Sequence, residues 1–274
     1  MMLRSLAAVT LIGAIAMITA CADGSDPHHL PGGPGSDGGS GGGGAGDGAK
    51  PGLIIVQTTP GLTGAAAIFS AVPVTGCTTR TIGPCQVRSC PNPGDEPGPR
   101  ASAGRVTISD GHADLVMDPD AENSYDYAPP DTGGAHFASG ATLTASAAGA
   151  DVPAFHGVTA VLPEPLAPVS ADIAIDVTRD LVVGWTGGGP GGKVVFLSET
   201  DDPQTIGQLS CAFDPAAHTG TVPAAALQAV PPCGPDAETC VWSLEPTAAV
   251  HFVAGDFAID YWVRGAGAIG EWTR

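Results

Sequence analysis

Glycine and proline constrain the fold of this chain more than any other feature. The 274 residues include 40 glycines and 26 prolines. Glycine loses more backbone entropy on folding than other residues, and proline lacks a backbone hydrogen-bond donor, so each destabilises a helix interior. Because the two residues together make up nearly a quarter of the chain, we do not expect a mostly helical fold.

The charge balance excludes one class of partner. Ten Lys and Arg stand against 28 Asp and Glu, which gives a formal net charge of −18. A nucleic-acid-binding surface needs a positive stripe that displaces counterions from the phosphates. We therefore expect no nucleic-acid partner.

The first 20 residues have the pattern of an export signal. Arg4 supplies the positive start, and the apolar stretch 6–19 is too short to span a bilayer comfortably. The tetrapeptide Ile18-Thr19-Ala20-Cys21 resembles the lipobox of bacterial lipoproteins, in which the chain is cut just before the Cys. The resemblance implies acyl chains on Cys21, and two or more such chains suffice for stable membrane attachment. A plain secretory signal with an accidental Cys at the cut is the alternative.

The residue after Cys21 bears on localisation. In many Gram-negative lipoproteins an Asp directly after the lipidated Cys retains the protein at the inner membrane, whereas here Ala22 follows. The resemblance therefore implies a lipid-anchored protein of the cell envelope, at the outer membrane rather than the inner one.

Residues 21–51 form a low-complexity segment rich in Gly and Ser, with almost no large apolar side chains. Such a sequence cannot form a core and behaves as a flexible coil. It contains no Gly-x-x-x-x-Gly-Lys-[Ser/Thr] and follows no strand, so a phosphate-binding loop is excluded. We interpret it as a tether.

From Gly52 onward, short β-branched and apolar segments alternate with turn residues, which is typical of an all-β sandwich or barrel. One segment, 222–230, has helical propensity. Alternation places Leu181, Val183 and Trp185 on one face of a strand. The predicted strands are 53–58, 65–72, 105–109, 113–117, 141–147, 152–161, 172–178, 181–186, 193–198, 206–213, 240–244, 248–252 and 257–264.

A cluster of prolines at Pro163, Pro165 and Pro168 suggests a semi-rigid junction. We therefore predict two β-sandwich domains, 52–164 and 165–274, each of a normal domain size.

The second half carries a family resemblance. The stretch from Pro165 and Pro168 through 172–177 to the strand bearing Trp185 resembles the first two strands of fibronectin type III and related immunoglobulin-like domains. The whole arrangement also resembles the uncharacterised two-domain lipoproteins of myxobacteria. The fibronectin-like resemblance covers the second half only and brings no known activity. We expect two immunoglobulin/fibronectin-like sandwiches in all. No Cys…Trp…Cys frame surrounds Trp185, so the core disulfide of antibody domains is not implied.

Six cysteines remain after Cys21, and an exported protein meets an oxidising compartment, so disulfides are expected among fifteen possible connectivities. If the chain turns at Gly83-Pro84, residues whose numbers sum to 167 face each other, which favours Cys77 with Cys90. Cys233 and Cys240 bracket a short loop and are a second candidate pair. Cys85 and Cys211 are left to pair across the halves or to stay free. Zinc binding by the first three cysteines is disfavoured because their spacing forms no Cys-x2–4-Cys knuckle.

No catalytic motif is present. None of the seven histidines forms His-x-x-x-His or His-Glu-x-x-His, and no Gly-x-Ser-x-Gly occurs. We therefore expect no enzyme, no catalytic or metal-binding residue and no cofactor. The histidines are His28, His29, His112, His136, His156, His218 and His251.

An acidic run in the first half is the best candidate site, because oxygen-rich loops between strands can chelate Ca²⁺. It lacks the order of a calcium-binding helical loop, and a solvated acidic face is the favoured interpretation. Tyr125 and Tyr127 nearby either form a contact surface or pack against the sheet. The acids are Asp110, Asp114, Asp118, Asp120, Glu122, Asp126 and Asp131.

Two classes of function follow. The first is a monomeric binding or structural module, displayed on a membrane through its lipid, with an unidentified protein or carbohydrate ligand; this rests on fold analogy. The second is a Ca²⁺-dependent carbohydrate binder or a hydrolase that uses the acidic loops. Carboxylates that converge in a sugar-sized cleft would favour the second class, and scattered acids would favour the first.

Overall fold

The computed structural model describes residues 48–59, 62–91, 98–127, 137–170, 173–201, 205–230 and 240–271. This part of the chain is nearly all β, as the sequence predicts. Its α-helix is α2 (Ala224–Ala229), and a 3₁₀ turn, η2 (Pro215–Ala217), precedes it. The strands are β1 (Lys50–Thr59), β2 (Leu62–Phe69), β3 (Thr78–Ile82), β4 (Cys85–Pro91), β5 (Val106–Ser109), β6 (Asp114–Met117), β7 (Tyr125–Tyr127), β8 (Thr142–Ala147), β9 (Phe155–Val161), β10 (Leu166–Pro168), β11 (Leu181–Gly187), β12 (Lys193–Asp201), β13 (Thr205–Phe213), β14 (Thr219–Val222), β15 (Cys240–Ala254), β16 (Phe257–Arg264) and β17 (Ala268–Glu271).

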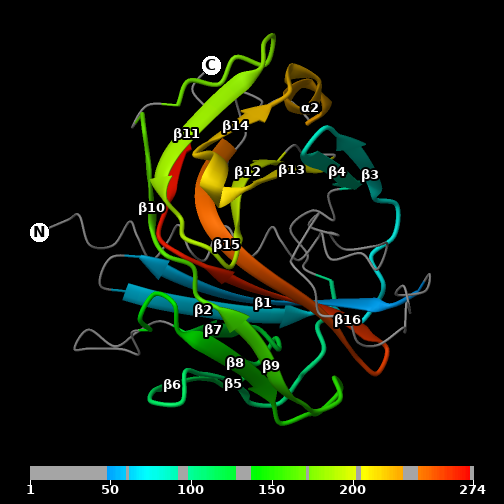
Figure 1. Cartoon of the computed structure of the whole chain (residues 1–274). Coiled ribbons are helices and arrows are strands. Elements are labelled where there is room, and N and C mark those ends of the chain that lie inside the picture. The colour runs from blue at the N-terminus through cyan, green and yellow to red at the C-terminus, as the bar shows by residue number, and fades with distance from the viewer. Residues whose placement is uncertain are drawn as a thin grey trace, which may run out of the picture.

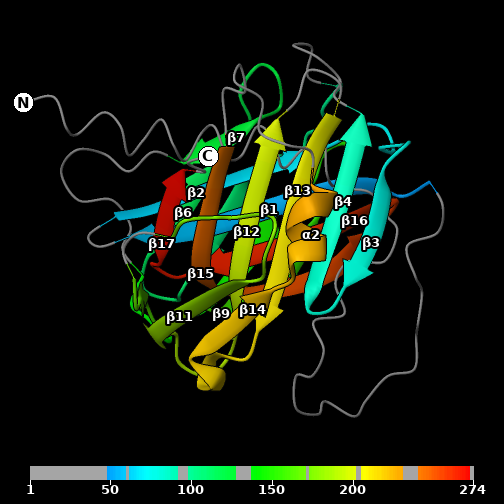
Figure 2. The ribbon, with the colours of Figure 1, turned by 90° about the horizontal axis from the view of Figure 1, so that it is seen from above.

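One ten-stranded sheet runs through the molecule, in the order β3-β4-β13-β12-β15-β16-β1-β2-β7, with β17 also on β15. Figure 2 shows β17, β15, β12, β13, β4 and β3 side by side, while β1 and β16 cross them at a steep angle. This rotation is the accumulated twist of a large sheet.

Two smaller layers cover the same face of the large sheet. The sheet β6-β5-β8-β9 packs on β1, β2, β16 and the end of β15 around Ile54, Phe69 and Ile259; we name this half the first sandwich. The sheet β10-β11-β14 and α2 pack on β4, β12, β13 and the start of β15 around Trp185 and Phe196; this half is the second sandwich. Figure 1 shows these layers at opposite ends of the molecule, with β15 curving from one to the other.

Strand β15 turns this corner at Pro246. The first part of β15 pairs with β12 and β17, and its last part pairs with β16. The register shifts by one residue between Thr247↔Arg264 and Leu244↔Ala268, so β16 and β17 are separated by a bulge at Gly265–Gly267. A proline has no N–H to donate, and a bulge opposite it both tolerates the missing donor and bends the strand. Residues 240–244 and 248–252, which the sequence predicts as two strands, are therefore one.

The strand pairings cross the predicted domain boundary at 164/165. The hairpin β3–β4 from the N-terminal half joins the second sandwich through β13, and β16 from the C-terminal half joins the first sandwich beside β1. The two sandwiches are therefore not two successive halves of the chain. Local apolar patterns report whether a segment is a strand but not which distant strand it pairs with.

Most other predicted strands lie where the sequence places them. The exception is 172–178, since residues 173–180 form no strand. Asp176 there accepts hydrogen bonds from the N–H and hydroxyl of Thr178 and from Arg179, which closes a turn. Ile175 from this segment is buried in the second sandwich. The strand that enters the sheet before β11 is instead the short β10.

Trp185 is buried, with 1% of its surface exposed, whereas Val182 on the opposite face of β11 is 67% exposed. Its ring stacks on Phe213 at a centroid distance of 5.9 Å, and its indole N–H donates to the carbonyl oxygen of Pro215 at 3.2 Å. A buried indole needs such an acceptor. The alternation predicted for β11 is therefore confirmed.

Candidate binding cavity

A cavity of about 1100 Å³ lies where the two sandwiches meet. The loop from β11 to β12, the turn η2 and the corner of β15 line it, and β9 contributes part of the rim. Much of its wall is the sheet face opposite the two hydrophobic cores, because the lining residues Val195, Leu197, Ala249 and Trp262 share that face. Ligand sites commonly occupy concave regions between packed units.

Charged and aromatic side chains from distant parts of the chain meet in this cavity. Six residues supply its distinctive chemistry: Lys193, Asp214, His218, His251, Asp260 and Trp262. They combine donors, acceptors and a flat ring, so the wall is neither uniformly apolar nor of a single charge sign.

His251 and Asp260 lie directly opposite each other on β15 and β16. His251 Nδ1 and Asp260 Oδ1 are 3.2 Å apart, and both side chains are about one-quarter to one-third exposed. The hairpin turn at Gly255 and Asp256 fixes this register, and Gly255 takes a φ of +63° that suits the first central residue of such a turn. The pair is held by backbone pairing and remains open to the cavity.

Lys193 is one of only two lysines in the chain. The other, Lys50, forms an ion pair with Asp256 at 2.8 Å. Lys193 follows a loop of glycines and one proline at 187–192 and has no ion pair within the described residues. Its ammonium group can therefore donate to a ligand.

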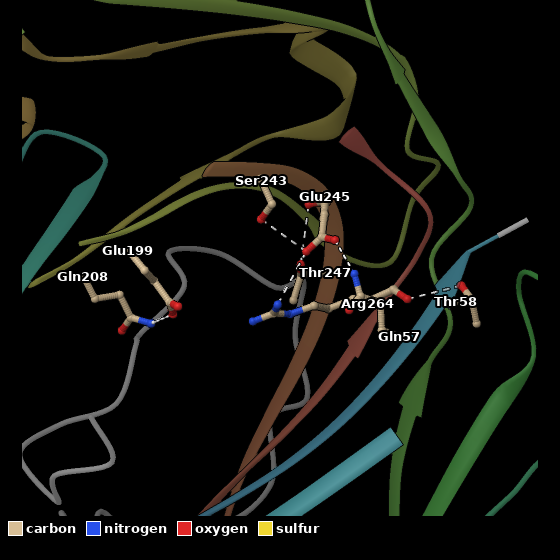
Figure 3. A network of polar contacts seen from close by, with 8 residues as sticks. All are labelled: Gln57, Thr58, Glu199, Gln208, Ser243, Glu245, Thr247 and Arg264. Carbon is tan, nitrogen blue, oxygen red and sulfur yellow. Dashed lines mark hydrogen bonds and ion pairs between the residues drawn. The ribbon is translucent and has the colours of Figure 1, made fainter. Parts of the chain in front are cut away.

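A buried polar network lies beside Trp262 on the same face of the sheet. The guanidinium of Arg264 lies over one face of the indole, 4.9 Å from its centroid. Arg264 Nη1 in turn pairs with Glu245 Oε2 at 3.5 Å, and Glu245 also accepts from Gln57 Nε2 and Ser243 Oγ. Figure 3 shows Gln57, Ser243 and Arg264 grouped around Glu245. This network holds the arginine, and the arginine packs on the ring.

Burial perturbs two glutamates of the network. Glu245 is 1% and Glu199 is 8% exposed, and burial raises the pKa of each carboxyl while Arg264 opposes the shift. Glu199 also accepts a hydrogen bond from Gln208 Nε2 at 3.0 Å. Within the described part of the chain, the Nε and Nη2 groups of Arg264 are buried and make no hydrogen bond. Two carboxyls around one guanidinium favour a protonated carboxyl.

Those acidic residues of the sequence prediction that the structure describes do not converge. Asp110 accepts from the backbone N–H groups of His112 and Ala113, which lowers its pKa, and Asp118 pairs with Arg105 at 2.8 Å with the same effect. Asp120 accepts from the N–H groups of Glu122 and Ser124. No group of three or more metal-ligating side chains occurs among the residues that the structure describes. Asp114 lies on β6, and Asp131 lies outside the described residues.

Three further side chains from this acidic region have defined environments. Asp126 lies on the exposed side of β7, and desolvation of its carboxyl, with Asp120 nearby, raises its pKa. Tyr125 is buried, and its hydroxyl accepts from the N–H of Ala103 at 2.7 Å while its ring meets Phe69 edge-on. Tyr127 is partly buried against the same core. The tyrosines therefore pack against the sheet.

Two disulfides lie in the described part of the chain. Cys77 is bonded to Cys90, the pairing that the sequence favoured, and the β3–β4 register follows the predicted sum of 167 from Thr78↔Ser89 to Ile82↔Cys85. Gly83 takes a φ of +60°, which accommodates the turn that Pro84 would strain in a type I geometry. Cys85 is bonded to Cys211 on β13, so the two leftover cysteines pair across the halves.

Several predictions fall outside what the structure describes. Cys21, Cys233, His28, His29 and His136 lie there, and so does the side chain of Cys240. In the described residues, no helix is both long enough and apolar enough to cross a membrane.

Comparison with models of known protein families finds no match, and no curated protein sequence matches either. The site must therefore be interpreted from its own chemistry.

Sequence analysis named His218 and His251 among the histidines but gave no role to them or to the other residues that form the cavity. A signal for one pair was present, because a turn at Gly255-Asp256 makes residues whose numbers sum to 511 face each other, as His251 and Asp260 do. Glu245 and Arg264 carried no such signal, since charged residues in a strand ordinarily face solvent.

Proposed function

We propose that this chain is an exported lipoprotein, held at the cell envelope through acylated Cys21, that acts as a binding module. The export signal and the lipobox-like tetrapeptide support the anchor, and the Gly-rich segment 21–51 supports a tether. The observation that carries the binding role is the cavity of about 1100 Å³ between the sandwiches. It exceeds the usual upper size of small-molecule sites, about 1000 Å³.

The cavity favours binding over the alternative built on the acidic loops. Asp110, Asp118 and Asp120 of the first sandwich are each engaged separately, in turns or an ion pair. The polar groups of the cavity instead converge on one space. A calcium-dependent carbohydrate binder or hydrolase that uses the acidic loops remains the second proposal, and calcium addition tests it below.

The anchor is tested by the variant Cys21→Ser. Acylation needs the thiol, so we expect the variant to be unprocessed or soluble while the natural chain pellets with membranes after a carbonate wash. A Ser variant that still pellets after the wash would rule out the lipid anchor.

The binding role is tested by filling the cavity. Ala249 is exposed and sits opposite Trp262 on the cavity wall, so Ala249→Trp should occupy the space without disturbing a core. We expect the detergent-solubilised full chain to be retained by envelope fragments of the producing bacterium and the variant to pass through. Val182→Trp, on an exposed face of the second sandwich, is the matched control and should be retained. Equal retention of all three proteins would contradict a binding role for the cavity.

A further inference from the structure

We infer that the cavity between the sandwiches binds a carbohydrate, with Trp262 as the surface on which a sugar ring lies. This inference rests on the proposed binding function and specifies its ligand class. Three features support it: the ring of Trp262, the polar groups around that ring and the volume of the cavity.

Trp262 offers a flat apolar surface at the cavity wall. Trp262 is partly exposed and lines the cavity, and it also packs with Leu53, Ile55 and Ile68. Arg264 packs on one face of the indole, and a ligand meets the part of the ring that lines the cavity. A flat ring matches the face of a sugar that carries only C–H groups, because both surfaces are broad and apolar while their edges are polar.

The polar groups around Trp262 match hydroxyls. Asp260 only accepts hydrogen bonds when it is ionised, Lys193 only donates, and His251 does one or both according to its protonation. A sugar hydroxyl donates and accepts at once, so neighbouring hydroxyls can satisfy acceptor and donor side chains together. The hydroxyls of Thr247 and Ser210 on the same wall add groups of the same dual kind.

Other ligand classes fit this wall less well. An apolar ligand would desolvate Lys193, His251 and Asp260 without replacing their hydrogen bonds to water. A simple cation would face the ammonium of Lys193, and a polyanion would meet a protein of net charge −18. The size of the cavity leaves room for more than one sugar ring.

The network of Gln57, Glu245 and Arg264 positions the ring. Thr247, Arg264 and Gln57 lie in one register row across β15, β16 and β1. Arg264 is held by Glu245, and its guanidinium stacks on Trp262. Arg264 is thus a positioning residue, since it acts through the ring of Trp262.

The experiment uses envelope fragments and the detergent-solubilised full chain. Fragments are first oxidised with periodate, which cleaves vicinal diols of sugars, or digested with a protease, and are washed before the chain is added. We expect retention to survive the protease and to fall at least about ten-fold after periodate. Retention that survives periodate, or that is lost on protease digestion, would overturn the carbohydrate inference while leaving a binding module in place.

The roles of Trp262 and His251 are tested with envelope fragments that have not been treated with periodate or protease. We expect Trp262→Ala to weaken retention by about ten-fold or more, the scale for losing an aromatic anchor, and His251→Ala to weaken it several-fold. Val182→Ala is the control and should bind as the natural chain does. Because His251 is exposed, its variant serves even if Trp262→Ala fails to fold. Unchanged retention in folded variants would overturn the inference, and no retention of the natural chain would overturn the binding module itself.

Discussion

The two sandwiches share one sheet but are held together differently. The first encloses Ile54, Phe69, Tyr125 and their neighbours, and no disulfide lies among its described residues. The second contains Trp185 and both disulfides, which involve the hairpin β3–β4. Both sandwiches recruit a strand over a long sequence separation, β1 with β16 in the first and β4 with β13 in the second, but among the described residues only the second pairing is reinforced by a covalent bond.

This comparison indicates which disulfide contributes most to the stability of the fold. A hairpin that is distant in sequence pays a large loop-closure entropy before it docks, and a disulfide removes that cost from the unfolded state. Cys85 and Cys211 are 126 residues apart, whereas Cys77 and Cys90 are 13 apart. The first bond fastens the hairpin to the sheet, and the second closes the hairpin on itself.

The largest expected loss of stability comes from removing the disulfide between Cys85 and Cys211. In the loop-entropy description, the double variant Cys85→Ala/Cys211→Ala loses about 5 kcal/mol of unfolding free energy, against about 3 kcal/mol for Cys77→Ala/Cys90→Ala. Urea unfolding of the two double variants measures the difference. Equal losses would show that the hairpin docks through packing alone and would remove the contrast between the sandwiches.

The next effect probes the core of the second sandwich. Trp185→Ala should cost about 3–5 kcal/mol because it empties a site enclosed by Phe213 and the surrounding core. Val182→Ala on the exposed face of the same strand is the control, with an expected change within about 0.5 kcal/mol. Since β15 belongs to both sandwiches, hydrogen exchange should show earlier opening of the first sandwich as well. Unaltered exchange there would mean that the two unfold independently.

A smaller effect concerns pH and the polar network. Burial raises the pKa of Glu199, so the folded state favours the protonated carboxyl. Its contribution to stability is complete below the ordinary Glu pKa of about 4.3 and is lost as pH rises through the raised value. Glu199→Gln keeps the acceptor for Gln208 and should lessen the fall in stability from about pH 4 toward neutral pH. Thermal unfolding across this range measures the slope, with exposed Glu122→Gln as the control. An unchanged slope in Glu199→Gln would contradict the assignment.

The smallest expected effect concerns calcium and the acidic loops of the first sandwich. Millimolar Ca²⁺ should leave the melting temperature almost unchanged, because these acids form no preorganised cage of six to eight oxygens. A real site at a hundred-fold excess of Ca²⁺ over its dissociation constant would add about 2.7 kcal/mol, or roughly 10 °C or more for a unit of about a hundred residues. A large rise that Mg²⁺ fails to reproduce would promote the calcium-dependent alternative.

The local sequence pattern predicted most of the strands and one hairpin register. Alternation at Leu181, Val183 and Trp185 identified the buried face of β11, and the turn at Gly83-Pro84 gave the register of a hairpin and the partner of Cys77. The short strands β10 and β17 were missed, since three or four positions show little period, although β5 and β6 of similar length were predicted. The segment 172–178 was predicted as a strand because its apolar residues alternate, but Asp176 closes a turn there.

The pairing of distant strands could not be predicted in this way. Nothing in the local sequence of β4 specifies β13, and nothing in β1 specifies β16. The candidate cavity depends on those pairings, because Lys193, Trp262 and Asp214 meet only after the sheet has assembled. The buried charges were hidden for the same reason, since a strand pattern assigns Glu245 and Arg264 to solvent unless another part of the molecule covers them.

Strand β1 lies between β2, which follows it directly, and β16, which begins with Phe257 opposite Lys50. This second neighbour begins 207 residues further along the chain, at Phe257 against Lys50. Contacts of such long separation form slowly, and an unpaired edge with side chains such as Ile54 and Val56 can pair with another chain instead. Strand β1 is therefore expected to gain its second neighbour late in folding, and the hairpin of β15 and β16 then protects it from aggregation.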